Sequence, residues 1–528
     1  TNSTFVGTLG SREFLAVNGI PNVFGLGSLY GPDTNATFVN PANVRRVNTD
    51  FDPEYFTSEQ QYQARLEQEI GSFKLQVTGL YQKSKVDSRQ DYNLNVADRS
   101  IYAAGLGTLQ AAAAGLVPGL PGAFFAPVAA AIIPNGAAGN LCVSDTDAPD
   151  TGSFGGNKIC AATPLDLDRS ATRGRSYSIE GILSSDFDGP LNFLVGGIYV
   201  DATAKDTDYY INAFGIDYIT GLLGTFNSLG RQGLAAIPGA TPPPPGYLGT
   251  SYFRNQTPDF TLKSYGIFGE VYWDITDRLQ FTGGLRYSND KKSLTARSTL
   301  ASFFVPHSAT SVFASPFVNG YAVTGAPLAS RLAPFDADPS TPCSIVSTTT
   351  TGILTPANTS GCELFQVRKV KYDEITGRAV LNFKITEDNL LYASYSRGYK
   401  SGGINPPLQP IFAVPTAFDP EIVNSFEIGS KNVFGNGVFT LNATAFYYQY
   451  KSLQLSRIVA RTSVNDNVDA DIYGLEIESI IRPSRELAVN MGFSYLHTKV
   501  SEDKFLGNPR DPSGGRSDTV IIKDITNG

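Results

Sequence analysis

The sequence predicts an all-β chain, an antiparallel transmembrane β-barrel, and three observations support this fold class. Apolar and polar residues alternate with the period of a strand in twelve segments. The connections between these segments alternate between tight turns and stretches of tens of residues. Charged residues make up only 17% of the 528 residues, while Gly, Tyr and Phe are abundant. Short turns on one side and long loops on the other are typical of barrels whose strands face lipid.

The strand period is clearest in the stretch 390–406. One face carries Leu391, Ala393 and Tyr395, and the other carries Tyr392, Ser394 and Ser396. A strand of a soluble β-sandwich has the same alternation, so this segment alone leaves both folds open. The pattern recurs along the chain with the same asymmetry of turns, and this recurrence favours the barrel.

Six hairpins account for the expected strands. They pair 62–70 with 73–81, 177–183 with 191–199, 265–271 with 279–287, 375–383 with the strand that starts the stretch 390–406, 426–428 with 439–447, and 473–477 with 487–495. The long connections are expected at 83–175, 201–262, 289–370, 401–420 and 455–470. Aromatic residues at the strand ends are predicted to lie at the membrane interface; they are Tyr81, Tyr199, Tyr287, Tyr395, Tyr447 and Tyr495.

Three regions are expected along the chain. Residues 1–60 are rich in turn signals and are predicted to form an extracellular loop region. Residues 61–497 would contain the barrel hairpins with their long extracellular loops, and 498–528 an extracellular loop with a truncated end. Within the first long loop the uncharged stretch 101–143 contains Pro118, Pro121 and Pro127, which would break a membrane helix at three places. We expect short helical pieces there and no transmembrane helix.

The four cysteines form two close pairs, Cys142 with Cys160 and Cys343 with Cys362. Neither pair has the spacing of a zinc or redox motif, and the chain has only two histidines, so no metal site is expected. We predict two disulfides that close loops in an oxidising compartment, with free loop thiols as the alternative.

Several functions are disfavoured by the residues. The net charge of −8 argues against a nucleic-acid surface. No GxSxG, HExxH or phosphate-binding loop is present, so we expect neither an enzyme nor a cofactor. His497 stands near Glu502 and Asp503, but a solvated histidine at the rim explains it better than a catalytic one.

The second half of the chain resembles the TonB-dependent outer-membrane receptors. The resemblance is carried by the segments LYASYSRGYKSGG (391–403), FDPEIVNSFEIGSKNVF (418–434), TLNATAFYYQYKSLQ (440–454) and IYGLEIES (472–479). It extends with good spacing from about residue 264 to 500, and more loosely back to 61. These motifs are specific to the family as a group and do not identify a ligand.

The resemblance implies a barrel of 22 strands with an N-terminal plug. The chain would then lack the plug, the TonB box, about four leading strands and about six trailing strands, relative to the 22 strands of such a barrel. It also implies a receptor in the outer membrane of a Gram-negative bacterium, in contact with outer-membrane lipid. Such a receptor takes up a scarce small-molecule solute with energy from the TonB–ExbB–ExbD complex. A ferric siderophore is the default solute, followed by cobalamin and oligosaccharides. A passive selective channel and a structural barrel that docks a partner are the alternatives.

Two groups of site residues follow. Inward-facing candidates for contact with a plug are Arg65, Glu67, Glu69, Glu180, Glu270, Arg286, Arg378, Glu427, Glu476 and Glu478; alternatively these charges hydrate a wide lumen and pair with one another. Candidates for ligand binding are Tyr252, Phe253, Arg254, Arg397, Tyr399 and Lys400, since aromatic and cationic groups at a barrel mouth can hold an iron complex. Alternatively Arg397 and Lys400 anchor at lipid headgroups, and the aromatic residues pack loop against loop.

Overall fold

The structure is a computed structural model, and it describes most of the chain. The described residues are 42–145 without 44, 93, 95 and 97, 158–215, single positions between 217 and 239, 253–300, 344–347, 354–358, 366–407, 414–459, 462–503, 505–507 and 522–524. Tyr252, Cys343 and Cys362 lie outside them, as does the side chain of Phe253.

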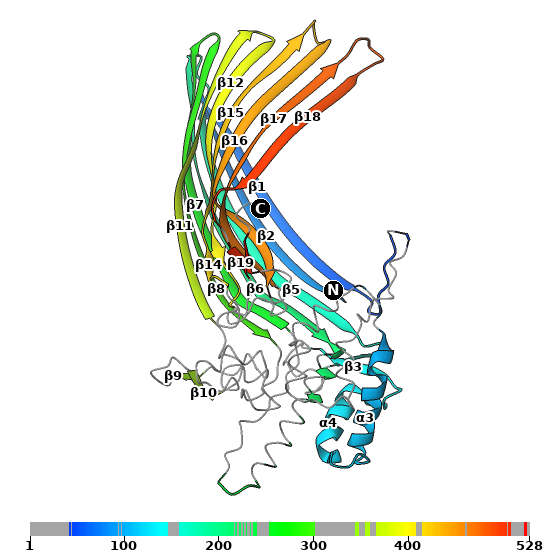
Figure 1. Ribbon diagram of the computed structural model, residues 1–528. Coiled ribbons are helices and arrows are strands. Elements are labelled where there is room, and N and C mark those ends of the chain that lie inside the picture. The colour runs from blue at the N-terminus through cyan, green and yellow to red at the C-terminus, as the bar shows by residue number, and fades with distance from the viewer. Residues whose placement is uncertain are drawn as a thin grey trace.

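One large antiparallel sheet of twelve strands dominates the molecule (Figure 1). In sheet order the strands are β1 (Glu54–Ile70), β2 (Phe73–Asp91), β5 (Asp166–Ser185), β6 (Leu191–Ala213), β7 (Phe253–Thr276), β8 (Leu279–Leu300), β11 (Gln366–Thr386), β12 (Asn389–Lys400), β15 (Glu421–Phe434), β16 (Phe439–Val459), β17 (Thr462–Ile481) and β18 (Val489–Val500). Each strand pairs with the next along the chain, which confirms the six predicted hairpins. The sheet ends at β1 and β18, which do not pair with each other.

Smaller elements lie among the long connections. They are η3 (Arg99–Tyr102), α3 (Ala103–Ala113), α4 (Gly122–Ile132), β3 (Leu141–Ser144), β4 (Lys158–Ala161), β9 (Ser344–Ser347), β10 (Leu354–Asn358), β13 (Gly403–Ile404), β14 (Ala417–Phe418), β19 (Phe505–Gly507) and β20 (Ile522–Asp524). The short helical pieces expected within 101–143 are therefore present. Pro118 and Pro121 lie between α3 and α4, but Pro127 lies inside α4, so it does not end a helix as predicted. Among the described helices, none has the length and apolar character needed to cross a membrane.

The strands are much longer than the sequence pattern predicted. β6 and β7 have 23 and 24 residues, whereas about 9–11 suffice to cross a bilayer at the usual tilt. The additional residues come from segments that were predicted as loops, such as 83–91 and 201–213. Most side chains of 83–91 and 201–208 are polar or small on both faces, so no apolar alternation marks them, although backbone pairing continues through them.

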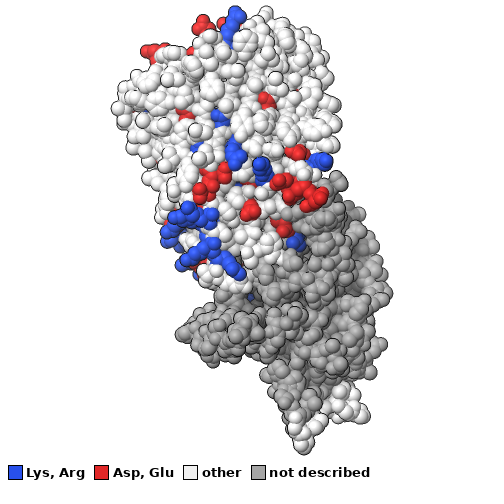
Figure 2. Space-filling model, turned by 60° about the vertical axis from the view of Figure 1, so that its left-hand side comes forward, with Lys and Arg blue, Asp and Glu red and all other residues white. Residues whose placement is uncertain are grey.

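The two faces of the sheet differ. Large apolar side chains cover its outer face and are exposed, for example Ile267 at 64% and Leu285 at 70%. Figure 2 views the convex side, and its upper part, toward the tight turns, carries few charged residues. The charged residues gather below this band, on the side of the long loops. This is the surface of a sheet with a lipid-facing belt.

A row of aromatic rings borders the apolar band on the loop side. Ring centroids lie 6.3 Å apart in Tyr62–Tyr81, 6.1 Å in Tyr177–Tyr199 and Tyr265–Tyr287, 5.1 and 6.4 Å in Tyr395–Phe426–Tyr447, and 4.8 Å in Tyr473–His497. We call this the aromatic row. Most of its members were predicted to end strands, but they lie within them, because pairing continues on the loop side. Tyr495 is opposite Leu475, one step nearer the turn.

Trp273 provides a test of this orientation. It is the single Trp of the chain, lies on the outer face of β7 and is 46% exposed. In vesicles of phosphatidylcholine with brominated chains, we expect strong quenching of the emission that is lost in the Trp273→Phe variant. As a control, Tyr272→Trp in that variant moves the ring to the opposite face, where the same lipids should quench it weakly. Equal quenching of both positions would contradict the assignment of faces.

Candidate functional site

The inner wall of the sheet carries the charged residues predicted to face the lumen. Arg65, Glu67, Glu69, Glu180, Glu270, Arg286, Arg378, Glu427, Glu476 and Glu478 all lie on the face opposite the aromatic row, by the register of the strands. A strand sends successive side chains to opposite faces, so parity alone was sufficient to place them.

One ion pair of this wall joins Glu270 on β7 to Arg378 on β11. The guanidinium donates two hydrogen bonds to the carboxylate, at 2.7 and 2.8 Å. β8 runs between these strands, and there Gly284 is opposite both residues. A Cβ at position 284 would lie 2.8 Å from Glu270 Oε2. The glycine therefore leaves the space that this ion pair occupies.

Other wall residues also have partners on the same face. Arg65 pairs with Glu67 and donates to Gln76 at 3.0 Å. Arg286 donates to Ser288 at 3.0 Å. Glu427 accepts a hydrogen bond from Tyr448 at 2.9 Å. Two ion pairs therefore join members of this set, Glu270 with Arg378 and Arg65 with Glu67, whereas Arg286 and Glu427 contact neutral side chains. The wall has a mixed charge, and contact of its residues with a plug stays a prediction.

Arg254 lies at the loop end of the sheet, near the start of β7. Arg254 is 8% exposed, and its guanidinium donates to both carboxylate oxygens of Asp208, at 2.9 and 2.6 Å. It also lies 5.8 Å from the ring centroid of Tyr210. These contacts join β7 to β6, so the geometry favours a structural role for Arg254 over contact with a ligand.

Arg397 and Tyr399 lie where β12 leaves β11. Arg397 is opposite Gly377 in the last residue pair of these strands, whereas β11 goes on pairing with β8 as far as Gln366. Arg397 donates to Glu374 at 2.7 Å and to Asn424 at 3.4 Å. Its guanidinium therefore fills the space where the strands separate.

Tyr399 reaches across β11 to β8. Its hydroxyl donates to Asp290 at 2.9 Å, and burial, with Asp290 nearby, raises the pKa of this phenol above its ordinary value. Lys292, two residues from Asp290, donates to the carbonyl of Gly402, and burial lowers the pKa of its ammonium group. Tyr372 donates to the carbonyl of Phe418 at 3.0 Å.

We call these residues the mouth cluster; its members are Asp290, Lys292, Tyr372, Glu374, Arg397 and Tyr399. Sequence analysis found Arg397 and Tyr399 and missed the other four. The inward parity of β8 and β11 would have found them if both strands had been extended past the aromatic row. Lys400 follows the cluster, exposed and opposite Glu421.

Asn405 holds the segment that follows β12 against the sheet. It is 3% exposed, and its side chain donates to the carbonyls of Pro415 and Asn465 at 3.0 and 2.8 Å and accepts from the Asn465 amide at 2.8 Å. Because Asn465 lies on β17, these bonds attach the segment to that strand.

A small domain of its own stands at the ends of β5 and β6. We call η3, α3, α4, β3 and β4 the cap. Its core includes Leu106, Leu109, Phe125 and Ile132, all fully buried. Tyr102 contacts Phe214 and Tyr218, just past β6, at centroid distances of 5.1 and 5.9 Å. The disulfide Cys142–Cys160 joins β3 to β4, as predicted; the second predicted pair lies outside the described residues.

A buried carboxylate fixes the cap to the sheet. Asp217 is 1% exposed and accepts hydrogen bonds from the amide and the hydroxyl of Ser144, both at 2.6 Å. Asn212, at the end of β6, donates to the Ser144 carbonyl at 2.8 Å. Ser144 is therefore held by the residues at the end of β6.

We expect Asp217→Ala to loosen the cap. Leaving the buried donors of Ser144 without this acceptor costs about 1–3 kcal/mol of local stability. Trypsin should then cleave faster at Arg99, which in the intact cap donates to the carbonyls of Ala137 and Gly139. The matched control is Thr108→Ala on the surface of α3, which should not change cleavage. Unchanged cleavage of the Asp217 variant would contradict this role.

A family model and a curated relative match this chain. The family model described as TonB dependent receptor-like, beta-barrel, matches residues 5–516. The Pesticin receptor of Yersinia enterocolitica is 22% identical over 281 residues, which cover 52% of this chain and 32% of that protein. The chain thus spans about a third of the length of this curated relative.

Two solved structures show a weaker likeness to this chain. The ferric yersiniabactin uptake receptor FyuA from Yersinia pestis is 13% identical with a TM-score of 0.44, over 85% of this chain and 43% of that one. The siderophore receptor PiuA from Acinetobacter baumannii is 15% identical with a TM-score of 0.46, over 90% and 50%. The family model, which spans nearly the whole chain, decides the assignment: the chain belongs to the TonB-dependent receptors and contains strands of their β-barrel.

Proposed function

We propose that this chain forms part of the wall and mouth of a receptor that takes up a scarce solute across a Gram-negative outer membrane. One observation carries the proposal: a mixed-charge inner wall, with ion pairs such as Glu270–Arg378, lies behind an apolar outer face, in a chain of this family. A ferric siderophore is the solute to test first. The proposal involves gated transport without covalent chemistry.

The inner wall would contact a plug domain. Plug contacts are proposed for Arg65, Glu67, Glu180, Glu270, Arg286, Arg378, Glu427, Glu476 and Glu478. Charges that already have partners on the wall can exchange them for polar groups of a plug without leaving an unpaired charge. TonB–ExbB–ExbD would then act on the plug to open the lumen.

The edges of the sheet support a larger barrel. β1 and β18 each pair with one neighbour in the described part of the chain. An unpaired backbone group in hydrocarbon costs several kcal/mol, so edge strands at membrane depth need partners. We propose that further strands pair with both edges, to give the 22 strands expected for this family.

The mouth would bind the solute through Tyr399, Lys400 and the residues that position them. The hydroxyl of Tyr399 donates to Asp290, which holds the ring in place. Lys400 is exposed, and Arg397 is anchored by Glu374 and Asn424. An aromatic ring beside a cation suits an anionic, ring-bearing iron chelate. Tyr252 and Phe253 remain candidates on the sequence alone.

Binding and uptake of a radiolabelled ferric siderophore by intact cells test this proposal. We expect Tyr399→Phe and Lys400→Gln each to weaken binding about tenfold, as loss of one hydrogen bond or charge contact typically does. Lys499→Gln on β18 is the control and should bind normally. Cells without TonB should keep binding and lose uptake. Uptake that persists without TonB would instead support the passive channel.

The cap can be removed as a unit to test capture by the loops. The amide of Tyr92 donates to the carbonyl of Asp166 at 3.1 Å, so a short glycine-rich linker can replace 93–165. We expect weaker solute binding with an intact barrel, measured by the heat-dependent shift of its electrophoretic mobility. Unchanged binding would contradict a role for this loop in capture. A stoichiometric protein partner that is lost with the cap would favour the docking alternative.

A further inference from the structure

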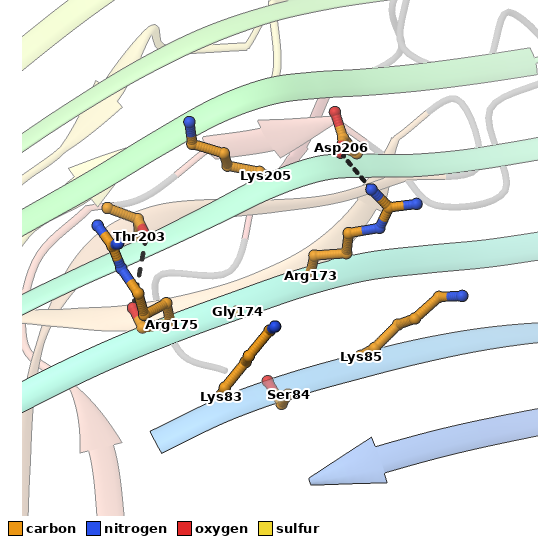
Figure 3. Close-up of a pocket in the computed structure, with 9 residues that line it drawn as sticks. All are labelled: Lys83, Ser84, Lys85, Arg173, Gly174, Arg175, Thr203, Lys205 and Asp206. Carbon is orange, nitrogen blue, oxygen red and sulfur yellow. Dashed lines mark hydrogen bonds and ion pairs between the residues drawn. The ribbon is translucent and has the colours of Figure 1, made fainter. Parts of the chain in front are cut away.

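Five cations gather on the outer face of neighbouring strands. Lys83 and Lys85 lie on β2, Arg173 and Arg175 on β5, and Lys205 on β6 (Figure 3). Register places Lys83 opposite Arg175, and Arg173 opposite both Lys85 and Lys205. All five side chains are exposed. We call this group the basic cluster.

Only one carboxylate among the lining residues of the cluster opposes the positive charge of its five cations. The nine residues around its depression of about 530 Å³ include a single carboxylate, Asp206. Asp206 lies 3.3 Å from Arg173, and both side chains are more than 60% exposed (65% and 63%), so solvent screens this pair. Two further carboxylates border the cluster, since Asp259 on β7 is opposite Lys205 and Asp87 follows Lys85 by two residues on the same face of β2. The five cations still outnumber these three carboxylates.

The cluster stands directly above the aromatic row. Lys83 follows Tyr81 by two residues and Arg175 precedes Tyr177 by two, on the same face. Two residues of a strand span about 7 Å, which places these ammonium and guanidinium groups at the level of lipid headgroups. They face outward, away from the lumen and from any solute passing through it.

Below the aromatic row the same strands form an apolar groove. Gly181 on β5 and Gly197 on β6 are opposite each other on the outer face. A Cβ at Gly181 would meet nothing within 4 Å. The groove has a volume of about 710 Å³, and Leu75, Leu183, Val195, Ile267, Gly269 and Leu285 are among its lining residues. We call it the glycine groove.

Spacing and chemistry join the two features. Six residues of β5 separate Gly181 from Arg175, about 20 Å along a strand. In a phosphorylated lipid, a comparable distance separates the anionic phosphates from the chains. We propose that the basic cluster and the glycine groove together bind one phosphorylated lipid of the leaflet on the loop side, with phosphates on the cations and chains in the groove. A free phosphate would use only the cluster.

The other half of the sheet supplies a contrast. At a comparable level of the outer face, Lys451 lies on β16 and Lys499 on β18, where Lys499 is opposite Asp471. These cations are separated by β17 and do not form a cluster. Their removal is the matched control for loss of charge at the same membrane interface.

The test uses native mass spectrometry of the natural protein after reconstitution in phosphatidylcholine nanodiscs that contain a diphosphorylated glycolipid. We expect wild type to retain this lipid. Lys85→Gln with Arg173→Gln and Arg175→Gln should weaken retention roughly a hundredfold, since each cation near an anionic surface contributes about a factor of five. The charge-preserving counterpart, Lys85→Arg with Arg173→Lys and Arg175→Lys, should retain the lipid like wild type.

Further variants test whether the groove takes part in binding and whether the cluster binds the lipid or only free phosphate. Gly181→Leu, which fills the groove and keeps every charge, should weaken lipid retention and leave binding of inorganic phosphate unchanged. Lys451→Gln with Lys499→Gln should retain the lipid like wild type. The proposal is overturned if the triple Gln variant retains the lipid, if Gly181→Leu has no effect, or if the control pair loses as much lipid as the triple Gln variant. Displacement of the lipid by inorganic phosphate alone would also overturn it.

Discussion

The structure depends on one constraint, the need to pair every backbone amide and carbonyl that lies in hydrocarbon. Twelve antiparallel strands meet this need by pairing in chain order, each with the next. Pairing does not stop at the edge of the apolar band, and strands such as β6 and β7 continue far beyond the aromatic row. The same ladder therefore serves as a membrane wall at one end and as the support of the mouth at the other.

Once the ladder is fixed, the alternation of side chains divides the chemistry between two faces. The outer face holds the apolar band, the aromatic row and the basic cluster. The inner face holds charges that pair across strands, as Glu270 does with Arg378 over Gly284. Glycines have different roles on the two faces. On the inner face, Gly284 leaves space for the Glu270–Arg378 ion pair, and on the outer face, Gly181 leaves a groove open toward the bilayer.

Beyond the membrane the long strands become scaffolds. The ends of β5 and β6 carry the cap, whose buried core and Ser144–Asp217 contacts make it an ordered body on the sheet. The separation of β12 from β11 creates the mouth cluster, where Arg397 and Tyr399 reach residues of strands that precede them in the sheet. Both features place polar or uncharged surfaces on the side of the long loops, where a solute would arrive.

The sequence by itself determined the fold class, the six hairpins and the face of every wall residue, because strand period and tight turns are local properties. It also indicated the family and the first disulfide. Only the tertiary structure decided where the strands end, since pairing through segments polar on both faces leaves no periodic signal. It alone decided that Arg254 is buried against Asp208 and that Tyr399 meets Asp290. Those contacts depend on which strands are neighbours and where they separate, which no single segment encodes.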